Sequence, residues 1–224
     1  MDFSPRSKLT ALQRDLLVAF FERQEGFFLT GGAALSGFYL GHRTTDDLDL
    51  FAPPGASLDD AARALSAAAI SLGGTTEAVK TFPEFRRLLA RRGEESCVVD
   101  LVVDRAPMLD VDKPARGRIR IDTMREIAAN KISALLGRAE IKDLVDLRDL
   151  LDAGISIESA LADASSKDAS ADAATVAWIL DQIKIGPGAA LPGAVDPVAL
   201  DRFRAELVVQ LQEAAFKQAS RGRG

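Results

Sequence analysis

Two aspartates separated by one residue, Asp47 and Asp49, form the pair in this sequence with the clearest capacity for chemistry. The segment Asp47–Phe51 reads DLDLF, and this alternation of acidic and apolar side chains is typical of a strand with two different faces. Both carboxylates then point to the same face, about 6–7 Å apart, and repel each other unless a cation separates them. The alternative is a half-exposed strand whose outer face is acidic.

A third aspartate, Asp100, interrupts the otherwise apolar segment CVVDLVV at residues 97–103. An unpaired charge inside such a strand is costly, so Asp100 requires a partner. If this strand pairs beside Asp47–Phe51, three carboxylates converge. Such oxygen ligands suit Mg²⁺ or Mn²⁺ bound together with substrate phosphates, and these ions support phosphoryl or nucleotidyl transfer. We therefore predict a metal site at Asp47, Asp49 and Asp100.

A pair of glycines, Gly31-Gly32, follows the apolar run 26–30 and precedes an apolar segment of helical length, AALSGFYLG. Glycines at a strand-to-helix turn let the backbone approach a ligand and leave the first helical N–H groups facing it, which suits a phosphate. Tight turns also use such pairs, but this one lies about fifteen residues before DLD. We predict that Gly31 and Gly32 bind phosphate, and that Arg43 contacts phosphate or offsets the nearby acids.

The surrounding sequence predicts an α+β fold, in which a mixed β-sheet flanked by helices is followed by an all-helical region. We expect a nucleotide-binding core at residues 1–122 and a helical domain at 123–224, where Trp178 packs in the core or between helices. The expected strands are 26–30, 47–51, 75–82, 85–92, 97–103 and 118–121. The expected helices are 8–24 with Ser7 as N-cap, 33–41, 57–72 with Ser57 as N-cap, 123–137, 140–152, 156–167, 170–184 and 197–218.

Composition excludes several classes of protein. One cysteine and one histidine among 224 residues exclude a disulfide scaffold and Cys- or His-rich metal sites. No apolar run approaches the roughly 20 residues that span a bilayer, and the opening MDFSPRSKLT has no apolar region of a signal peptide. We therefore expect a cytoplasmic protein with no membrane partner.

Basic residues concentrate in the middle of a chain whose formal net charge is −5. Residues 86–125 carry ten basic and seven acidic side chains. Arg116, Arg118 and Arg120 alternate and predict a one-sided basic stripe, which with Arg86, Arg87, Arg91 and Arg92 is suited to an RNA backbone. The alternative is a solvated edge strand protected by charge.

The segment LTGGAALSGFYLGHRTTDDLDLF resembles the first motif of the DNA polymerase β-like nucleotidyltransferase superfamily. More narrowly, GG-x-AL, GHR and DLDLF are similar to the AbiEii/AbiGii-type toxin nucleotidyltransferases of bacterial abortive-infection and toxin–antitoxin systems. The later segments EIAANKISALLGR and KDLVDL resemble that family's lysine-containing helix and its D-x-x-D motif. The resemblance covers roughly residues 26–151, and it departs from the family where Gly-Gly replaces the more usual Gly-Ser.

This resemblance implies a role for each matching residue. Gly31 and Gly32 hold the triphosphate of an NTP, Asp47 and Asp49 hold the metal, and Asp100 completes the site and helps to deprotonate the acceptor. Four further residues are implied as catalytic or nucleotide-binding: Lys131, Arg138, Asp143 and Asp146. Lys131 reaches the triphosphate, whereas the two aspartates shape the nucleotide pocket or position the lysine. From spacing alone, Lys131 and Arg138 share one helix face, which is also what a solvated face provides.

The expected function is transfer of a nucleoside monophosphate from an NTP to an acceptor hydroxyl with release of pyrophosphate. The resemblance implies an RNA acceptor, such as a tRNA 3′ end, and a toxin countered by a cognate antitoxin. Two alternatives stay open at this point. One is the same chemistry on a small-molecule or protein hydroxyl, and the other is a catalytically silent NTP-binding module.

Overall fold

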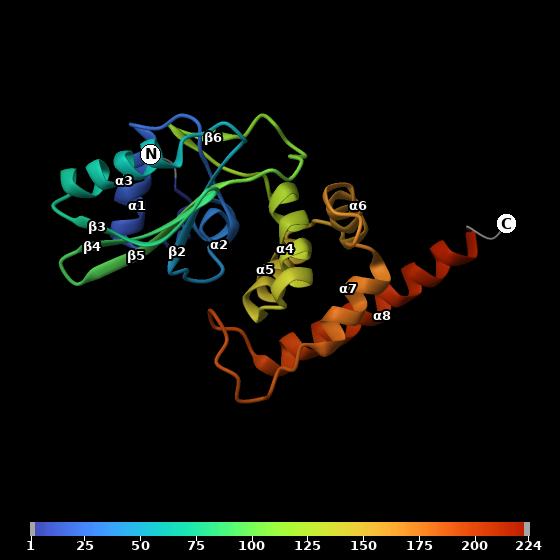
Figure 1. Ribbon diagram of the computed structural model, residues 1–224. Helices are drawn as coiled ribbons and strands as arrows, with labels where there is room; N and C mark the ends of the chain where they lie inside the picture. Colours follow the sequence, from blue (N-terminus) through green and yellow to red (C-terminus); the bar gives the residue numbers. More distant parts are fainter. Residues whose placement is uncertain (1–2, 222–224) are drawn as a thin grey trace. The chain divides into compact units, whose positions relative to one another are not determined.

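The computed structural model describes residues 3–221 of the chain, which divides into two compact units, Met1–Thr123 and Met124–Gly224 (Figure 1). Every strand within the described residues belongs to the first unit, and the second unit is built from helices. This arrangement confirms the predicted α+β class. The expected division into two domains stays a prediction.

The first unit is built on a five-stranded mixed sheet with the strand order β1-β2-β5-β4-β3. Strands β2 and β5 are parallel, and every other neighbouring pair is antiparallel. The predicted pairing of the DLD strand with the strand of Asp100 is therefore confirmed. The strands are β1 (Phe28–Thr30), β2 (Asp47–Ala52), β3 (Thr75–Phe82), β4 (Phe85–Arg92) and β5 (Glu95–Val103).

The two faces of the sheet differ because side chains alternate along each strand. In β2, Leu48 and Leu50 are buried, whereas Asp47 and Asp49 are only half-buried. Helices α1 (Ala11–Phe21) and α3 (Leu58–Ser71) pack together and against the sheet. The core of the first unit lies between these helices and the apolar face, and we call the opposite face, which bears Asp47 and Asp49, the carboxylate face.

Helix α1 begins three residues later than the sequence pattern predicts. Thr10, and not Ser7, is the N-cap, and its hydroxyl accepts the backbone N–H of Gln13 while the Gln13 side chain accepts the N–H of Thr10. This reciprocal capping box satisfies two N–H groups at once, which a serine three residues earlier does not do. Ser57 caps α3 as predicted, since its hydroxyl accepts the Asp60 N–H.

The glycine pair opens a helix that changes character along its length. A short α-helix, α2 (Gly31–Ala34), continues directly into a π-helical segment, η1 (Leu35–Tyr39). Gly31 has φ +65°, a left-handed conformation that glycine adopts without steric cost. The predicted order of strand, glycine turn and helix is confirmed, and the π-helical turn is a feature that apolar spacing alone did not indicate.

The predicted basic stripe does not form. The segment folds into a small hairpin of β6 (Ala115–Arg116) and β7 (Ile119–Arg120). Gly117 turns the chain between them with φ +61°, so the arginines do not continue along one strand. Arg118 and Arg120 line one hollow, whereas Arg116 acts electrostatically on Tyr39.

The second unit consists of five helices within the described residues. They are α4 (Met124–Arg138), α5 (Ile141–Asp152), α6 (Ile157–Lys167), α7 (Ala173–Gln182) and α8 (Pro197–Arg221). Ile127, Ile132 and Leu135 of α4 are fully buried, as their spacing predicts. The prediction for Trp178 is wrong, because its side chain is 62% exposed on α7. None of the helices between residues 3 and 221 is long and apolar enough to cross a membrane.

Candidate active site

Four neighbouring strands place polar side chains opposite one another on the carboxylate face. Thr30 of β1 lies opposite Asp49 of β2, Asp49 lies opposite Asp100 of β5, and Asp100 lies opposite Arg87 of β4. Residues directly opposite in a sheet point to the same face, with adjacent strands about 4.8 Å apart. The fold therefore brings side chains of four strands into one polar row, with Asp47 two residues from Asp49.

Asp47 is the outer member of the DLD pair, and its environment leaves part of the carboxylate open. Its Oδ1 accepts a hydrogen bond of 2.7 Å from the hydroxyl of Thr45. Thr45 is buried, and its carbonyl oxygen accepts the side-chain amide of Gln13 at 2.8 Å. The loop before β2 is thus tied to α1, and the position of the Asp47 carboxylate follows from that anchor.

The glycine pair lies so close to this row that a side chain at either position would displace a neighbouring side chain. A Cβ on Gly31 would lie 2.4 Å from Oδ2 of Asp49, and a Cβ on Gly32 would lie 2.5 Å from Nη2 of Arg43. The Arg43 side chain is buried, and its Nη1 donates to the carbonyl of Thr44 at 2.9 Å. The structure therefore brings together the predicted phosphate-binding glycines, Arg43 and Asp49.

Asp100 is engaged differently from the other two aspartates. Arg87 donates to both of its oxygens, from Nε at 2.8 Å and from Nη2 at 2.6 Å. The Asp100 side chain is 8% exposed, so this bidentate pair supplies the partner that a buried charge requires. The predicted set of three open carboxylates is not present, because one of the three is held by a guanidinium.

The residues fit a divalent cation only in part. Among residues 3–221, no group of three carboxylate, imidazole or thiol side chains is close enough to hold a metal ion. Asp47 and Asp49 nevertheless offer two half-buried carboxylates on one face, and Mg²⁺ commonly takes one or two carboxylates with water and substrate phosphates completing its shell. The donor set thus fits a metal bound jointly by Asp47, Asp49 and a nucleotide, and Asp100 as a further ligand stays a prediction.

The second unit contains a buried cluster of its own around Lys131 of α4. Its Nζ lies 2.8 Å from Asp143 and 2.6 Å from Asp146, and neither carboxylate is exposed. Arg138 also donates to both oxygens of Asp143, at 2.8 and 2.9 Å. The structure therefore joins the four residues that the resemblance singled out, since Lys131 contacts both aspartates and Arg138 contacts Asp143. Their roles toward a nucleotide stay predictions.

The charges in this cluster stabilise one another. Burial lowers the pKa of Lys131, but the carboxylates of Asp146 and Asp143 outweigh this effect and raise its pKa above the ordinary value. Burial raises the pKa of Asp143, but the hydrogen bonds from Arg138 and the charge of Lys131 outweigh it and lower the pKa. Lys131 is accordingly a fixed cation at neutral pH and not a proton acceptor.

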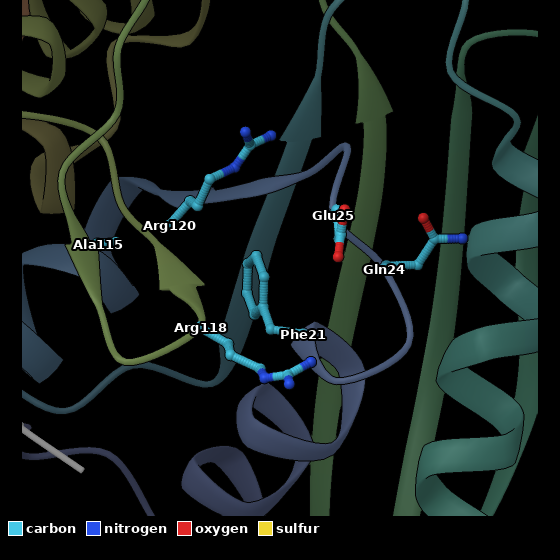
Figure 2. Close-up of a pocket in the computed structure, with 6 residues that line it drawn as sticks. All are labelled: Phe21, Gln24, Glu25, Ala115, Arg118 and Arg120. Atoms are coloured by element: carbon cyan, nitrogen blue, oxygen red, sulfur yellow. The ribbon is translucent and has the colours of Figure 1, made fainter.

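A hollow of about 390 Å³ lies beside the end of α1, outside the carboxylate face. Arg118 and Arg120 approach it from the β6–β7 hairpin, Gln24 and Glu25 approach from the loop after α1, and Phe21 lies between them (Figure 2). Nε of Arg120 also donates to the carbonyl of Phe27 at 3.3 Å.

The other basic side chains of the predicted RNA track are divided between faces and partners. Arg86 pairs with Asp59 of α3 at 2.9 Å, on the face opposite Arg87. Arg92 pairs with Asp15 at 2.6 Å and with Glu95 at 2.9 Å. The single track along residues 86–120 is therefore wrong, because neighbouring arginines in a strand point to opposite faces.

Arg87 is the site residue whose place the sequence analysis missed. The sequence pattern groups Arg87 with the basic track. The register of the β4–β5 hairpin instead places it opposite Asp100. The signal in the sequence was an isolated acid in CVVDLVV and an arginine at the matching position of the preceding strand. That match becomes visible only when the hairpin register is known.

Comparison with solved structures shows which fold this is. The crystal structure of JHP933 from Helicobacter pylori superposes with a TM-score of 0.55 at 19% identity, covering 95% of this chain and 98% of that one. A second H. pylori crystal structure, whose name assigns it provisionally as a nucleotidyltransferase, gives 0.52 at 21% identity, with 90% and 95% covered. At such identities these likenesses establish the fold alone. No curated protein matches the sequence.

A family model supplies the stronger comparison, because it matches most of the chain. The model describes the nucleotidyl transferase AbiEii toxin of Type IV toxin–antitoxin systems and matches residues 15–222. This range spans the carboxylate face, the glycine turn and the Lys131 cluster, and it extends far beyond the segment on which the sequence resemblance rests. The chain belongs to the AbiEii nucleotidyl transferase toxin family and is a nucleotidyltransferase.

Proposed function

We propose that this nucleotidyltransferase transfers a nucleoside monophosphate from an NTP to a hydroxyl of RNA, with Mg²⁺ held by Asp47 and Asp49. The observation that carries the proposal is the juxtaposition of the DLD strand with the glycine turn, where Asp49 Oδ2 occupies the space of a Gly31 side chain. A turn without side chains beside two carboxylates accommodates phosphates and their cation together.

The proposed reaction requires little covalent participation by the protein. The acceptor hydroxyl loses its proton to water and its oxygen bonds to the α-phosphorus. The bond from this phosphorus to the bridging oxygen breaks, and pyrophosphate leaves. When bound, Mg²⁺ supplies charge neutralisation at the phosphates and activation of the attacking oxygen. Asp47 and Asp49 would hold that ion, and the backbone N–H groups at Gly31 and Gly32 would face the phosphates. Both oxygens of Asp100 accept hydrogen bonds from Arg87, and the role of Asp100 in deprotonating the acceptor stays a prediction.

The acceptor and the biological role are proposed from family membership. The family is described as the toxin of Type IV toxin–antitoxin systems, which supports a growth-inhibiting activity and a cognate antitoxin. The sequence resemblance adds an RNA acceptor such as the 3′ end of tRNA.

A second candidate, transfer to a small-molecule or protein hydroxyl, is favoured by the charge distribution. The chain carries a formal net charge of −5. Arg86 and Arg92, which the RNA proposal would use, are engaged with acidic side chains of the same unit. A polyanion such as RNA gains less electrostatic binding free energy from a surface whose arginines pair with acidic side chains than from an open basic track.

The test is to incubate the protein with each α-³²P-labelled NTP, Mg²⁺ and total bacterial RNA. The inactive control is Asp47→Asn/Asp49→Asn, and the matched control is Asp59→Asn, which removes an exposed carboxylate of the same unit. We expect label in a discrete RNA band with wild type and Asp59→Asn, but not with Asp47→Asn/Asp49→Asn. Pyrophosphate release without labelled RNA supports the second candidate. Absence of both reactions supports a catalytically silent module and contradicts the proposal.

A further inference from the structure

The two side chains of the Arg87–Asp100 ion pair differ in how far they are exposed to solvent. The Asp100 side chain is 8% exposed and that of Arg87 is 36% exposed, although the two are joined by two hydrogen bonds. The Asp100 carboxylate is therefore nearly enclosed, while the Arg87 side chain remains partly exposed on the carboxylate face. Phe85 lies beside it, with its ring centroid 5.7 Å from the guanidinium carbon, and further restricts the arginine.

The guanidinium is within electrostatic reach of the whole carboxylate row. Its pKa is raised chiefly by the hydrogen bonds to Asp100, against the opposing effect of burial, and then by the charges of Asp100, Asp47 and Asp49. Arg87 is thus one cation whose charge offsets the carboxylates of this row. The Asp100 oxygens accept hydrogen bonds from Nε and Nη2 of Arg87, which directs this carboxylate toward the guanidinium.

Two of the five N–H donors of Arg87 account for its bonds to Asp100, which leaves others for a ligand. Its Nη1 makes no hydrogen bond within the part of the chain that the structure describes. The guanidinium is planar. While the N–H groups of one edge bond to Asp100, those of the other edge point in the direction in which they can donate to phosphate oxygens. Asp49 lies opposite Asp100, between Arg87 and the glycine turn. Arg87 is therefore at the end of the polar row that lies away from Gly31 and Gly32.

We propose that Arg87 is a phosphate-binding residue of the nucleotide site and that Asp100 is its positioning residue and not a metal ligand. The proposal rests on the proposed function for the identity of the nucleotide. It differs from the sequence prediction in assigning the third carboxylate to an arginine. The ligand class is a polyphosphate, which Arg87 meets at the end of the row away from Gly31.

The experiment measures two bindings separately, without turnover. Mn²⁺ binding to the protein alone is followed by electron paramagnetic resonance, and binding of inorganic tripolyphosphate and of each NTP is followed by calorimetry in Mg²⁺. The variants are Arg87→Gln, Arg87→Lys, Asp100→Asn and Arg87→Gln/Asp100→Asn. The double variant replaces the ion pair by two amides, so it leaves no unpaired charge in the sheet and separates binding from folding.

Arg86→Gln is the matched control, because Arg86 precedes Arg87 in the same strand and pairs with Asp59 on the opposite face. We expect Arg87→Gln and the double variant to weaken tripolyphosphate and NTP binding by about tenfold or more, the loss typical of one charged hydrogen-bonding group. Asp100→Asn weakens the same binding, and its effect does not add to that of Arg87→Gln. Arg87→Lys restores part of the affinity. Mn²⁺ binding changes by less than about twofold throughout, because Asp47 and Asp49 are intact.

Four outcomes overturn the inference or separate it from the proposed function. Loss of Mn²⁺ binding in Asp100→Asn, with a gain in Arg87→Gln, makes Asp100 a metal ligand that Arg87 masks. Unchanged polyphosphate binding in folded Arg87→Gln/Asp100→Asn makes the pair purely structural, even if wild type transfers NMP. Arg87-dependent polyphosphate binding without any NMP transfer sustains this inference and contradicts the proposed function. A wild-type protein that binds neither tripolyphosphate nor any NTP overturns both.

Discussion

Individual side chains in this protein act through partners held at short range, and Gly31 is the sharpest case. Its position combines φ +65° with a distance of only 2.4 Å between the Cβ that an alanine would add there and Asp49 Oδ2. Such a separation is far inside van der Waals contact, so a side chain there must displace the carboxylate. The glycine is required by both the backbone and the neighbour.

We predict that Gly31→Ala reduces NMP transfer by about tenfold or more, as expected for a misplaced metal-binding carboxylate. The matched control is Gly73→Ala, because Gly73 has φ +74° but nothing within 4 Å of a Cβ. Both variants incur the ~1–2 kcal/mol cost of a left-handed alanine. Urea unfolding and the labelling assay together separate the two effects. Equal transfer by the two variants contradicts the role assigned to the contact with Asp49.

Lys131 provides a second prediction at the scale of single residues. Lys131→Met leaves Asp143 and Asp146 without their shared cation, and both carboxylates are 0% exposed. We expect the free energy of unfolding to fall by about 3–5 kcal/mol, as for other broken buried ion pairs. Lys142→Met is the control, since the exposed pair of Lys142 with Glu140 contributes less than about 1 kcal/mol. Urea denaturation measures both, and equal small losses would contradict the buried-pair interpretation.

The lowered pKa of Asp143 predicts how stability depends on pH. A carboxyl whose pKa is lower in the folded than in the unfolded protein stabilises the fold above the unfolded value, about 3.9. This contribution is lost as the pH falls through the lowered value of the folded state. We therefore expect the stability difference between wild type and Asp143→Asn to be constant above about pH 5 and to narrow below about pH 4. Urea unfolding at pH 7, 5 and 3 tests this, and a constant difference would contradict it.

At the scale of elements, helix ends and strand register decide where the site residues lie. Helix α1 is fixed by Thr10 and Gln13, and the same Gln13 side chain holds the loop that leads to Asp47. One helix cap thus links the core of the first unit to the start of the DLD strand. Strand β4 has a comparable role, since its register with β5 sets Arg87 on Asp100.

The cap of α1 yields a prediction that separates the observed helix start from the expected one. Thr10→Ala removes the hydroxyl that accepts the Gln13 N–H, and we expect a loss of about 1 kcal/mol in the free energy of unfolding. Ser7→Ala, at the position that the sequence pattern favoured, should change stability by less than about 0.5 kcal/mol. Thermal and urea unfolding measure both variants. A larger loss of stability in Ser7→Ala than in Thr10→Ala would contradict the observed cap and indicate that the helix begins after Ser7.

The whole molecule carries one natural probe in each unit. The single cysteine, Cys97, is buried in β5, and burial raises the pKa of its thiol to about 12. The single tryptophan, Trp178, is 62% exposed on α7 of the second unit. The thiol therefore reports on unfolding of the first unit, and the indole reports on the second.

We predict that the native protein is inert toward a thiol reagent at pH 8, whereas iodide quenches its tryptophan fluorescence. In urea, we expect the thiol and fluorescence transitions to differ in midpoint, because each unit has a buried core of its own. Trp178→Phe serves as the control for the fluorescence signal. Coincident transitions would show that Met1–Thr123 and Met124–Gly224 unfold as one cooperative unit, contrary to the two expected domains.

Local patterns in the sequence determined most helices and strands, and they determined the part of the candidate site formed by the DLD strand and the glycine pair. These patterns depend on neighbours within a few residues, as in the alternation of DLDLF, the Ser57 cap and the glycine pair. Strands, helices and the glycine turn were therefore predictable from spacing. The shared face of Lys131 and Arg138 follows from helical periodicity in the same way.

Only the tertiary structure decided what each charge pairs with. Arg87 and Asp100 are thirteen residues apart and meet through strand register, and a shift of one residue would send either to the opposite face. The buried state of Lys131 depends on α5, and the exposure of Trp178 depends on which face of α7 finds a partner. These outcomes arise from packing between distant segments, and periodicity within one segment carries no information about them.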